Sequence, residues 1–263
     1  MKEHPRLFLG KKPPQKDART LALSSFLKPD LKVPPEYDFD LKNRDIPTPM
    51  LGNDKESCCV ITARAHQTLR FEKTEQGVVI PITEGDVHKQ YRKESGGEDF
   101  GLNMLASLKS WRKKGWRAGS QVYDIFAFGS LYLGSGEKLL AVDFLALQQA
   151  IVYLTGVQVG LDLPLSAQDQ FDQGLPWTVT EGPKARPGTW GGHAILIPGY
   201  TALGPTCATW ARKQSMSWPF FFKYADEAYG VVDNRDRWLG KKSPVDIAKL
   251  TEILQTVTTK KAA

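Results

Sequence analysis

Two adjacent cysteines, Cys58 and Cys59, are the residues of this 263-residue chain best suited to nucleophilic chemistry. They lie in "GNDKESCCVIT", ahead of a run whose apolar residues recur at helical spacing, with Ser57 as a candidate N-cap. Both cysteines then fall in the first turn of a helix. A cysteine attacks a carbonyl carbon only as a thiolate, and its free pKa of about 8.5 falls at a helix N-terminus or beside an imidazolium. The alternative is that both cysteines are small buried side chains.

The chain has four histidines, one of which must serve as the base if either cysteine is a nucleophile. His66 follows Cys59 by seven residues, which places it about 10 Å along the same predicted helix and favours a structural role. His193 opens an apolar strand directly after two glycines in "GTWGGHAILIPGY" and lies 134 residues after Cys59. A satisfied core histidine is the alternative for this position. The spacing nonetheless resembles that of Cys-His hydrolases of the papain type, in which the histidine follows the cysteine by roughly 130 to 150 residues.

The elements that must position these residues change in kind along the chain. The first half predicts helices from Ser57, over 84–94, over 102–114 and over 142–156, with a short strand or extended segment at 77–83. The second half predicts strands over 157–164, 191–202, 207–214 and 228–233, with a helix over 218–228 between the last two. Helices first and antiparallel strands second indicate an α+β protein with two lobes that meet in a cleft.

Several ordered motifs resemble the papain-like cysteine peptidases. "VPPEYDFDLKNRDIPTPMLGNDKESCCVITARAH" is similar to the start of the mature enzymes, and "GGEDFGLNMLASLKSWRKKGW" to their Gly-Gly loop and following helix. "LLAVDFLALQQAIVYLTGVQVGLDL" resembles the helix and strand that cross to the second lobe. "GGHAILIPGY" resembles the histidine strand, and "ATWARKQSMSWPFFFKYADEAYGVV" a shortened Trp-rich segment. The pieces "FLGKKPPQKDARTLALSSFL", "MLGND" and "MSWPFFFKYADEAY" look most like a poorly characterised papain-like group of phages and bacteria.

The resemblance implies a set of roles. It makes Cys59 the nucleophile, His193 its base, and Asn53, six residues before the cysteine, the side-chain donor of the oxyanion hole. Cys58 falls where the family has Ser or a small residue. The sequence departs from the family at Ala208, where an asparagine should orient the histidine. Three residues are therefore candidates for a supporting role: Trp210, Thr209 and Gln214.

The resemblance also divides the chain. We expect an extended N-terminal arm over 1–32, a papain-like domain over 33–250 and a basic tail over 251–263. Within the domain, the helical lobe covers about 50–140 and the β lobe about 141–240. The Pro- and Lys-rich arm either packs on its own domain or binds another protein.

Composition narrows the partners and the location. The formal net charge is +6, but no nucleic-acid-binding module accompanies it, and the longest apolar runs are too short to span a membrane. The start of the sequence has no apolar segment of the secretory type, and three cysteines provide no disulfide framework. We therefore expect a cytoplasmic location, in a bacterium or a phage host, with a virion as the alternative.

Two functions follow from these observations. The first is a papain-like thiol hydrolase, a peptidase or amidase, that acts on a peptide or protein without a cofactor or metal, because neither cysteines nor histidines have metal-ligand spacing. The second is a catalytically silent papain-like module that binds a partner or forms part of a particle, with the arm as its attachment.

Overall fold

The structure is a computed structural model that describes residues 7–133, 141–234, 239–240 and 242–259. Its main sheet is antiparallel, with the strand order β10-β9-β8-β7-β11-β4 and with β1 paired to β8. The two middle strands, β7 and β8, are buried along almost their whole length. The strands of this sheet are β1 (Tyr37–Asp38), β4 (Ile125–Ser130), β7 (Val157–Leu163), β8 (Gly191–Tyr200), β9 (Pro205–Thr209), β10 (Arg212–Ser215) and β11 (Ala225–Asp233).

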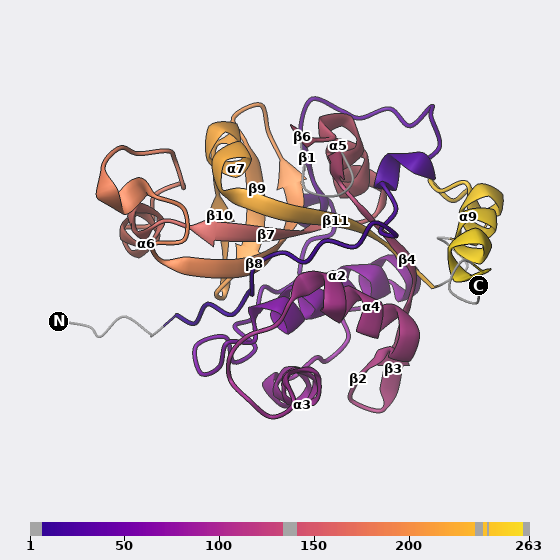
Figure 1. Cartoon of the computed structure of the whole chain (residues 1–263), viewed down its shortest axis with the longest axis horizontal. Helices are drawn as coiled ribbons and strands as arrows, with labels where there is room; N and C mark the ends of the chain where they lie inside the picture. Colours follow the sequence, from indigo (N-terminus) through magenta and orange to yellow (C-terminus); the bar gives the residue numbers. More distant parts are fainter. Residues whose placement is uncertain (1–6, 134–140, 235–238, 241, 260–263) are drawn as a thin grey trace.

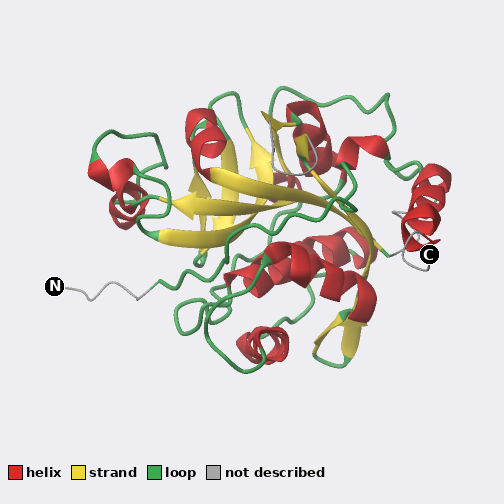
Figure 2. Ribbon diagram, in the orientation of Figure 1, coloured by secondary structure: helices red, strands yellow, loops and turns green. Residues whose placement is uncertain are grey.

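Helices lie on both sides of this sheet (Figures 1 and 2). On one side α2 packs on β8 and α4 on β4, whereas α5 and α7 pack on the other side. The helices of more than one turn are α2 (Cys59–Gln76), α3 (Glu84–Ser95), α4 (Met104–Lys114), α5 (Phe144–Tyr153), α6 (Leu165–Asp172), α7 (Trp218–Tyr224) and α9 (Ile247–Thr259). Small two-stranded sheets join β2 (Trp116–Ala118) to β3 (Gln121–Tyr123) and β5 (Tyr132–Leu133) to β6 (Ala141–Val142). The prediction of an α+β fold with a helical lobe and a β lobe is confirmed.

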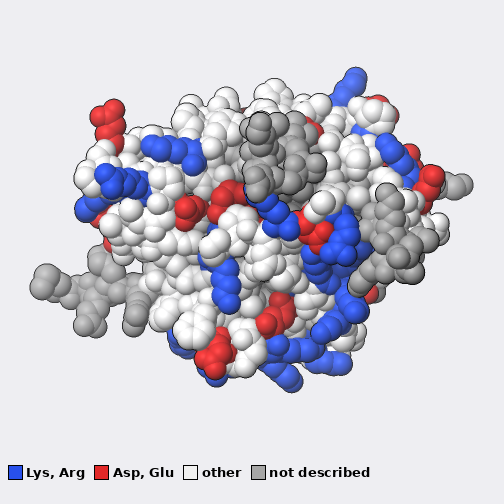
Figure 3. All heavy atoms as spheres, viewed as in Figure 1, with Lys and Arg blue, Asp and Glu red and all other residues white. Residues whose placement is uncertain are grey.

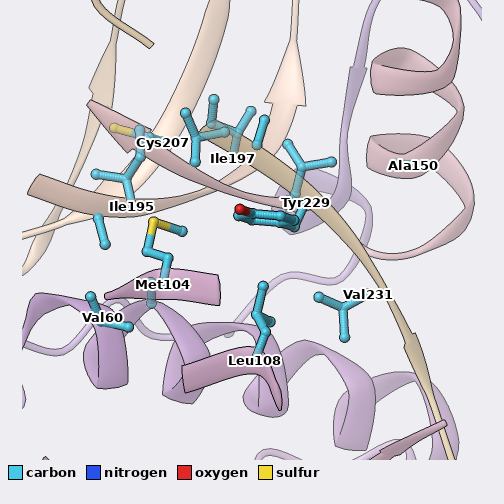
Figure 4. Packing of buried hydrophobic residues seen from close by; sticks show 14 of the residues in the cluster. Val60, Met104, Leu108, Ala150, Ile195, Ile197, Cys207, Tyr229 and Val231 are labelled. Atoms are coloured by element: carbon cyan, nitrogen blue, oxygen red, sulfur yellow. The ribbon is translucent and has the colours of Figure 1, made fainter. Parts of the chain in front are cut away.

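The core that joins the lobes lies between α2, α4 and the sheet (Figure 4). Val60 of α2 and Met104 of α4 point toward Ile195 of β8, and each of these side chains is at most 2% exposed. Burying an aliphatic side chain of this size contributes roughly 1.5–3 kcal/mol. The first turn of α2 is therefore held rigidly against the strand that carries His193.

Charged residues of α2 are buried as well, and each has a partner. Arg70 donates to both carboxylate oxygens of Asp40 at 2.9 and 2.6 Å, and Arg64 forms an ion pair with Glu94 at 2.9 Å. A buried charge without such a partner costs several kcal/mol, so these pairs fix the rotation of the helix about its axis. That rotation decides which of the two cysteines faces the sheet.

Several predicted boundaries were wrong. The helix after the double cysteine begins at Cys59 with Cys58 as its N-cap residue, and Ser57 instead donates its backbone N–H to Asp99 at 2.9 Å. Residues 77–83 form no strand, and the strand predicted over 207–214 is the hairpin of β9 and β10. The sequence also gave no sign of β4, which joins the sheet from the helical half of the chain.

The predicted arm packs on its own domain. Leu23 and Phe26, around the short 3-10 helix η1 (Leu23–Ser25), are fully buried, and residues before them run between the sheet and α2 (Figure 1). The predicted basic tail over 251–263 is helical as far as the end of α9, and its last four residues lie outside the described part of the chain. The limits that we assigned to the domain stay a prediction.

The basic stretch around α4 lies at the surface. Arg112, Lys113, Lys114 and Arg117 are exposed, and Figure 3 shows Lys and Arg side chains gathered over this part of the molecule. Among the described residues, no helix combines the length and the apolar character that crossing a membrane requires.

Candidate active site

Cys59 is the first residue of α2, and its thiol faces the histidine strand. The backbone N–H of Ala194 donates to Sγ of Cys59 at 3.4 Å, and the backbone N–H of Gly10 also contacts this sulfur. The side chain is fully buried, and burial raises the pKa of the thiol to about 11. Cys59 is therefore a protonated thiol in this conformation, although it stands at a helix N-terminus.

Cys58 and Cys207 lie in different surroundings. Sγ of Cys58 points toward the carbonyl oxygen of Leu51 (3.8 Å) and the hydroxyl of Thr62 (3.6 Å), and burial raises the pKa of this thiol to about 12. Cys207 is buried within β9, and burial raises its pKa too. All three cysteines are free, and Cys59 is the one whose sulfur contacts the backbone beside His193.

His193 is held on two sides within the β lobe. Its Nε2 lies 2.7 Å from the hydroxyl oxygen of Thr209, and its ring stacks on the indole of Trp210 with 3.9 Å between ring centroids. Its other ring nitrogen, Nδ1, is buried and has no hydrogen-bond partner in the described chain. Burial lowers the pKa of the ring to about 3, so His193 is neutral here.

Thr209, which follows Ala208 on β9, places its hydroxyl against the histidine. When Nε2 donates its proton to the Thr209 hydroxyl, the lone pair on Nδ1 is free to accept a proton. Gln214, the other polar candidate, donates instead to the backbone carbonyls of Leu175 (2.8 Å) and Ser215 (3.1 Å). The structure therefore brings Thr209 to the histidine and leaves Gln214 elsewhere.

Trp210 reaches the histidine through an unusual turn. Trp210 and Ala211 join β9 to β10 with φ angles of 40° and 60°, in the left-handed region that two-residue hairpins usually fill with Asn and Gly. Each such residue costs on the order of 1–3 kcal/mol. Because Trp210 also packs against Phe171, Trp177 and Trp190, this aromatic cluster fixes the strained turn and with it the plane of the His193 ring.

Asn53 lies in the turn that leads to α2 and is almost fully buried. Its side-chain amide donates to the carbonyl oxygens of Phe8 at 3.1 Å and Glu56 at 3.2 Å. The amide thus faces a carbonyl group of the N-terminal arm. His66 lies elsewhere, with Nε2 3.0 Å from the Pro49 carbonyl oxygen, in the structural role that its spacing predicted.

The N-terminal arm closes the junction between the lobes. Lys11 donates its backbone N–H to the carbonyl of Gly192 at 3.0 Å. The backbone of Leu102 accepts from Lys12 at 2.9 Å and donates to Gly10 at 2.7 Å. A Cβ atom at Gly10 would lie 1.9 Å from the Ser57 carbonyl oxygen, so only glycine permits this approach. The arm is thus a peptide bound by its main chain directly over Cys59.

Comparison with known proteins finds similar structures but no family model or curated protein that matches the sequence significantly. Among solved structures, the chain is similar to xylellain, a cysteine protease from Xylella fastidiosa. That match has a TM-score of 0.63 and 15% identity over 88% of this chain and 98% of that one.

Two further solved structures agree. A cysteine protease from Carica candamarcensis matches with a TM-score of 0.56 and 15% identity, over 77% of this chain and all of that one. A procathepsin B from Trypanosoma congolense matches with a TM-score of 0.55 and 12% identity, over 87% of each chain. The chain therefore has the papain-like cysteine protease fold, as the sequence motifs predicted.

Sequence reasoning missed the polar residues that surround the arm. It placed Asp226 in a helix, whereas α7 ends at Tyr224 and β11 begins at Ala225, so that Asp226 and Glu227 lie on a strand. It placed Lys11 in the extended N-terminal arm and named no partner for this side chain. The sequence signal that could have found this cluster is the acidic pair in "KYADEAYG", because two carboxylates that open an apolar strand require a cationic partner.

Proposed function

We propose that this protein is a thiol hydrolase of peptide bonds, with Cys59 as nucleophile and His193 as general base. The observation that carries the proposal is the hold on His193: Thr209 engages Nε2, Trp210 covers one face, and Nδ1 is left without a hydrogen-bond partner among the described residues. His66 also leaves its Nδ1 without a hydrogen-bond partner among the described residues, so it is the position of His193 beside the cysteine that gives its open Nδ1 a role. The neighbouring residue, Ala194, contacts the Cys59 sulfur, which supports pairing of the two side chains.

In the proposed reaction, a substrate carbonyl takes the position next to Cys59. Nδ1 of His193 accepts the thiol proton, and the sulfur adds to the carbonyl carbon. The tetrahedral intermediate collapses, the C–N bond breaks, and the proton on Nδ1 leaves with the amine. A water molecule then attacks the thioester with His193 again as the base, which releases the acid and restores the thiol.

The oxyanion donors in this proposal are the backbone N–H of Cys59 and the side-chain amide of Asn53. The contact of this amide with the Phe8 carbonyl oxygen supports the assignment, because it is a hydrogen bond to a peptide carbonyl of a chain bound at the junction. Loss of one such donor typically costs on the order of 3 kcal/mol in the transition state.

The reaction requires that the arm leave the junction. With the arm in place Cys59 is fully buried, its thiol is protonated and the His193 ring is neutral. Once the arm moves, water reaches both groups and the burial that drives these pKa shifts is relieved. The thiolate then gains the stabilisation of the α2 N-terminus.

The test is thiol reactivity in a chain whose arm is loosened by Gly10→Val. A small alkylating reagent at neutral pH should label Cys59 much faster than Cys58 or Cys207, and adding His193→Ala should abolish the difference. A peptide library should be cleaved by this chain and not by its Cys59→Ala form. Equal, slow labelling of all three cysteines with no cleavage would contradict the proposal.

The sealed site also supports the second function, a papain-like module without catalysis, and the same experiment decides between the two. A silent module would show a loosened arm and an accessible Cys59 without accelerated labelling. Both proposals are compatible with a relation to phage and bacterial papain-like proteins and with a cytoplasmic or virion location. Both also allow the arm to bind an assembly partner.

A further inference from the structure

The side chain of Lys11 lies in a buried acidic pocket beside the candidate active site. Nζ of Lys11 donates to Oδ2 of Asp226 at 2.7 Å and lies 3.6 Å from Oε1 of Glu227. The Lys11 side chain is only 2% exposed, although its backbone belongs to the segment that passes over Cys59. A lysine this deeply buried is rare unless it is paired, so the pocket is shaped for a cation.

The pocket exists because β7 carries a glycine opposite the acidic residues of β11. Gly160 pairs with Glu227 across the two strands, and a Cβ atom on it would lie 2.6 Å from Cδ of Lys11. The same Cβ would lie 2.7 Å from Cγ of Glu227. Any larger residue at this position would fill the space that the cationic chain uses. We name Gly160, Asp226 and Glu227 the acidic pocket.

Lys11 does not satisfy the acidic pocket completely. Oε2 of Glu227 accepts from the hydroxyl of Tyr229 at 2.9 Å, but its Oε1 is buried and has no hydrogen-bond partner within the described chain. The Glu227 side chain is 3% exposed. A buried acceptor without a donor is costly, which indicates that the acidic pocket can take a ligand with more donors than lysine has in this position.

The main chain around Lys11 is bound as a peptide ligand would be. Its N–H donates to the Gly192 carbonyl, and the residues on each side bond to the backbone of Leu102. These contacts recognise a peptide whatever its side chains, whereas the acidic pocket reads one side chain. A peptide that replaces the arm would therefore meet the same pocket at the same point.

We propose that the acidic pocket is a specificity pocket for the lysine or arginine side chain of a peptide bound at the junction, in the place that Lys11 occupies. The peptide as substrate rests on the proposed function, whereas the pocket and its cation do not. Arginine fits better than lysine, because its guanidinium carries five donors in a planar fork and can reach both carboxylates. A neutral side chain of the same length would leave the half-buried Asp226 and the buried Glu227 without a cation.

Binding is measured without catalysis. The full chain carries Cys59→Ala and a protease cleavage site inserted between the exposed residues Gln15 and Lys16, so that the arm can be cut and exchanged after folding. Dye-labelled peptides that span residues 7–15 then compete for the junction, with lysine, Lys11→Arg or Lys11→Met at the central position. We expect the arginine peptide to bind at least as tightly as the lysine peptide and the methionine peptide at least tenfold more weakly.

Variants of the acidic pocket assign the preference to its carboxylates. Asp226→Asn with Glu227→Gln should bring the lysine and methionine peptides within a factor of about two of each other. Asp169→Asn is the matched control, because Asp169 pairs with Lys184 at the surface, and it should keep the full preference. Equal binding of the lysine and methionine peptides to the unchanged pocket, or a preference that survives the double variant, would overturn the proposal.

Cleavage separates this inference from the proposed function. The chain with Cys59 restored should cleave peptides with Arg or Lys at the position that reaches the acidic pocket at least tenfold faster than norleucine analogues. A binding preference without cleavage would overturn the hydrolase and leave the pocket standing. Cleavage that ignores the basic residue would overturn the pocket and leave the hydrolase standing.

Discussion

Buried polar groups are neutral on one side of the bound arm, at Cys59 and His193, and charged on the other, in the acidic pocket. Around Cys59 and His193, burial raises the pKa of the thiol and lowers that of the ring, so both groups are neutral and few hydrogen bonds hold them. In the acidic pocket, Lys11 neutralises Asp226 by a direct ion pair. The arm thus covers the candidate catalytic pair through its shape and main-chain hydrogen bonds, whereas an ion pair holds it at the acidic pocket. Changes of shape and changes of charge should therefore have separable effects.

The largest effect is expected at the neutral pair. With the arm loosened by Gly10→Val, adding His193→Ala should lower peptide hydrolysis by on the order of a thousandfold, because no other base among the described residues contacts this site. The measurement is the initial rate on the best library peptide. His66→Ala is the control that removes a buried histidine held by the Pro49 carbonyl, and its turnover per folded molecule should stay close to that of the parent.

The next largest effect tests the role of shape. Gly10→Val places a side chain where Cβ meets the Ser57 carbonyl at 1.9 Å, so the arm must leave and the alkylation rate of Cys59 should rise by roughly a hundredfold or more. Gly85→Ala is the control, because its Cβ would meet only the Thr83 hydroxyl at 3.7 Å. An unchanged rate in the Gly10→Val chain would show that the arm does not control access.

A smaller effect is expected from the group that orients the histidine. Thr209→Val keeps the shape of the side chain and removes the hydroxyl that lies 2.7 Å from Nε2 of His193. We expect turnover to fall about ten- to a hundredfold, with the pH profile of the reaction shifted, because the imidazolium loses its partner. Thr209→Ser should restore most of the activity. If valine and serine behaved alike, the hydroxyl would have no positioning role.

The sequence predicted the fold, the placement of Cys59 at the start of a helix and that of His193 on a strand. Helical periodicity after Cys59 and strand periodicity after His193 are properties of the local sequence, and the two residues are 134 positions apart. The part of the site that it missed depends on tertiary contacts. The sequence made Thr209 a candidate but could not select it over Gln214. The left-handed turn at Trp210 that aligns the hairpin contains no glycine, so the sequence did not predict it.

The acidic pocket was even harder to predict from the sequence. Lys11 and the acidic pair of β11 are separated by more than two hundred residues, and nothing in either segment specifies the other. The sequence predicts one helix over 218–228. In the structure α7 ends at Tyr224, where the pairing of β11 with β7 begins. A one-residue difference in that boundary would decide whether Glu227 faces the core or the surface.

A separate prediction concerns stability rather than rate, namely a pH dependence that arises in the acidic pocket. The pKa of Glu227 is raised from 4.5 to about 7, chiefly by burial and also by the Asp226 carboxylate, while Lys11 and Tyr229 oppose the shift. A carboxyl whose folded-state pKa is raised stabilises the fold fully below its unfolded pKa and loses this contribution as the pH rises through the folded value. The free energy of unfolding should therefore fall by up to about 3 kcal/mol between roughly pH 4.5 and pH 8.

Denaturant unfolding of the Glu227→Gln chain at several pH values checks this prediction, because the variant has no carboxyl to titrate and its stability should fall less over the same range. Burial raises the pKa of Asp226 as well, and that of the tyrosines Tyr132 and Tyr229, so Asp226 contributes to the remaining slope with the same sign while both phenols stay neutral. Glu84→Gln is the matched control, since Glu84 pairs with Lys55 at the surface and its pKa is lowered. Parallel curves for the wild type and Glu227→Gln would mean that Glu227 is ionised throughout, and the charge on that side of the arm would then be fixed rather than dependent on pH.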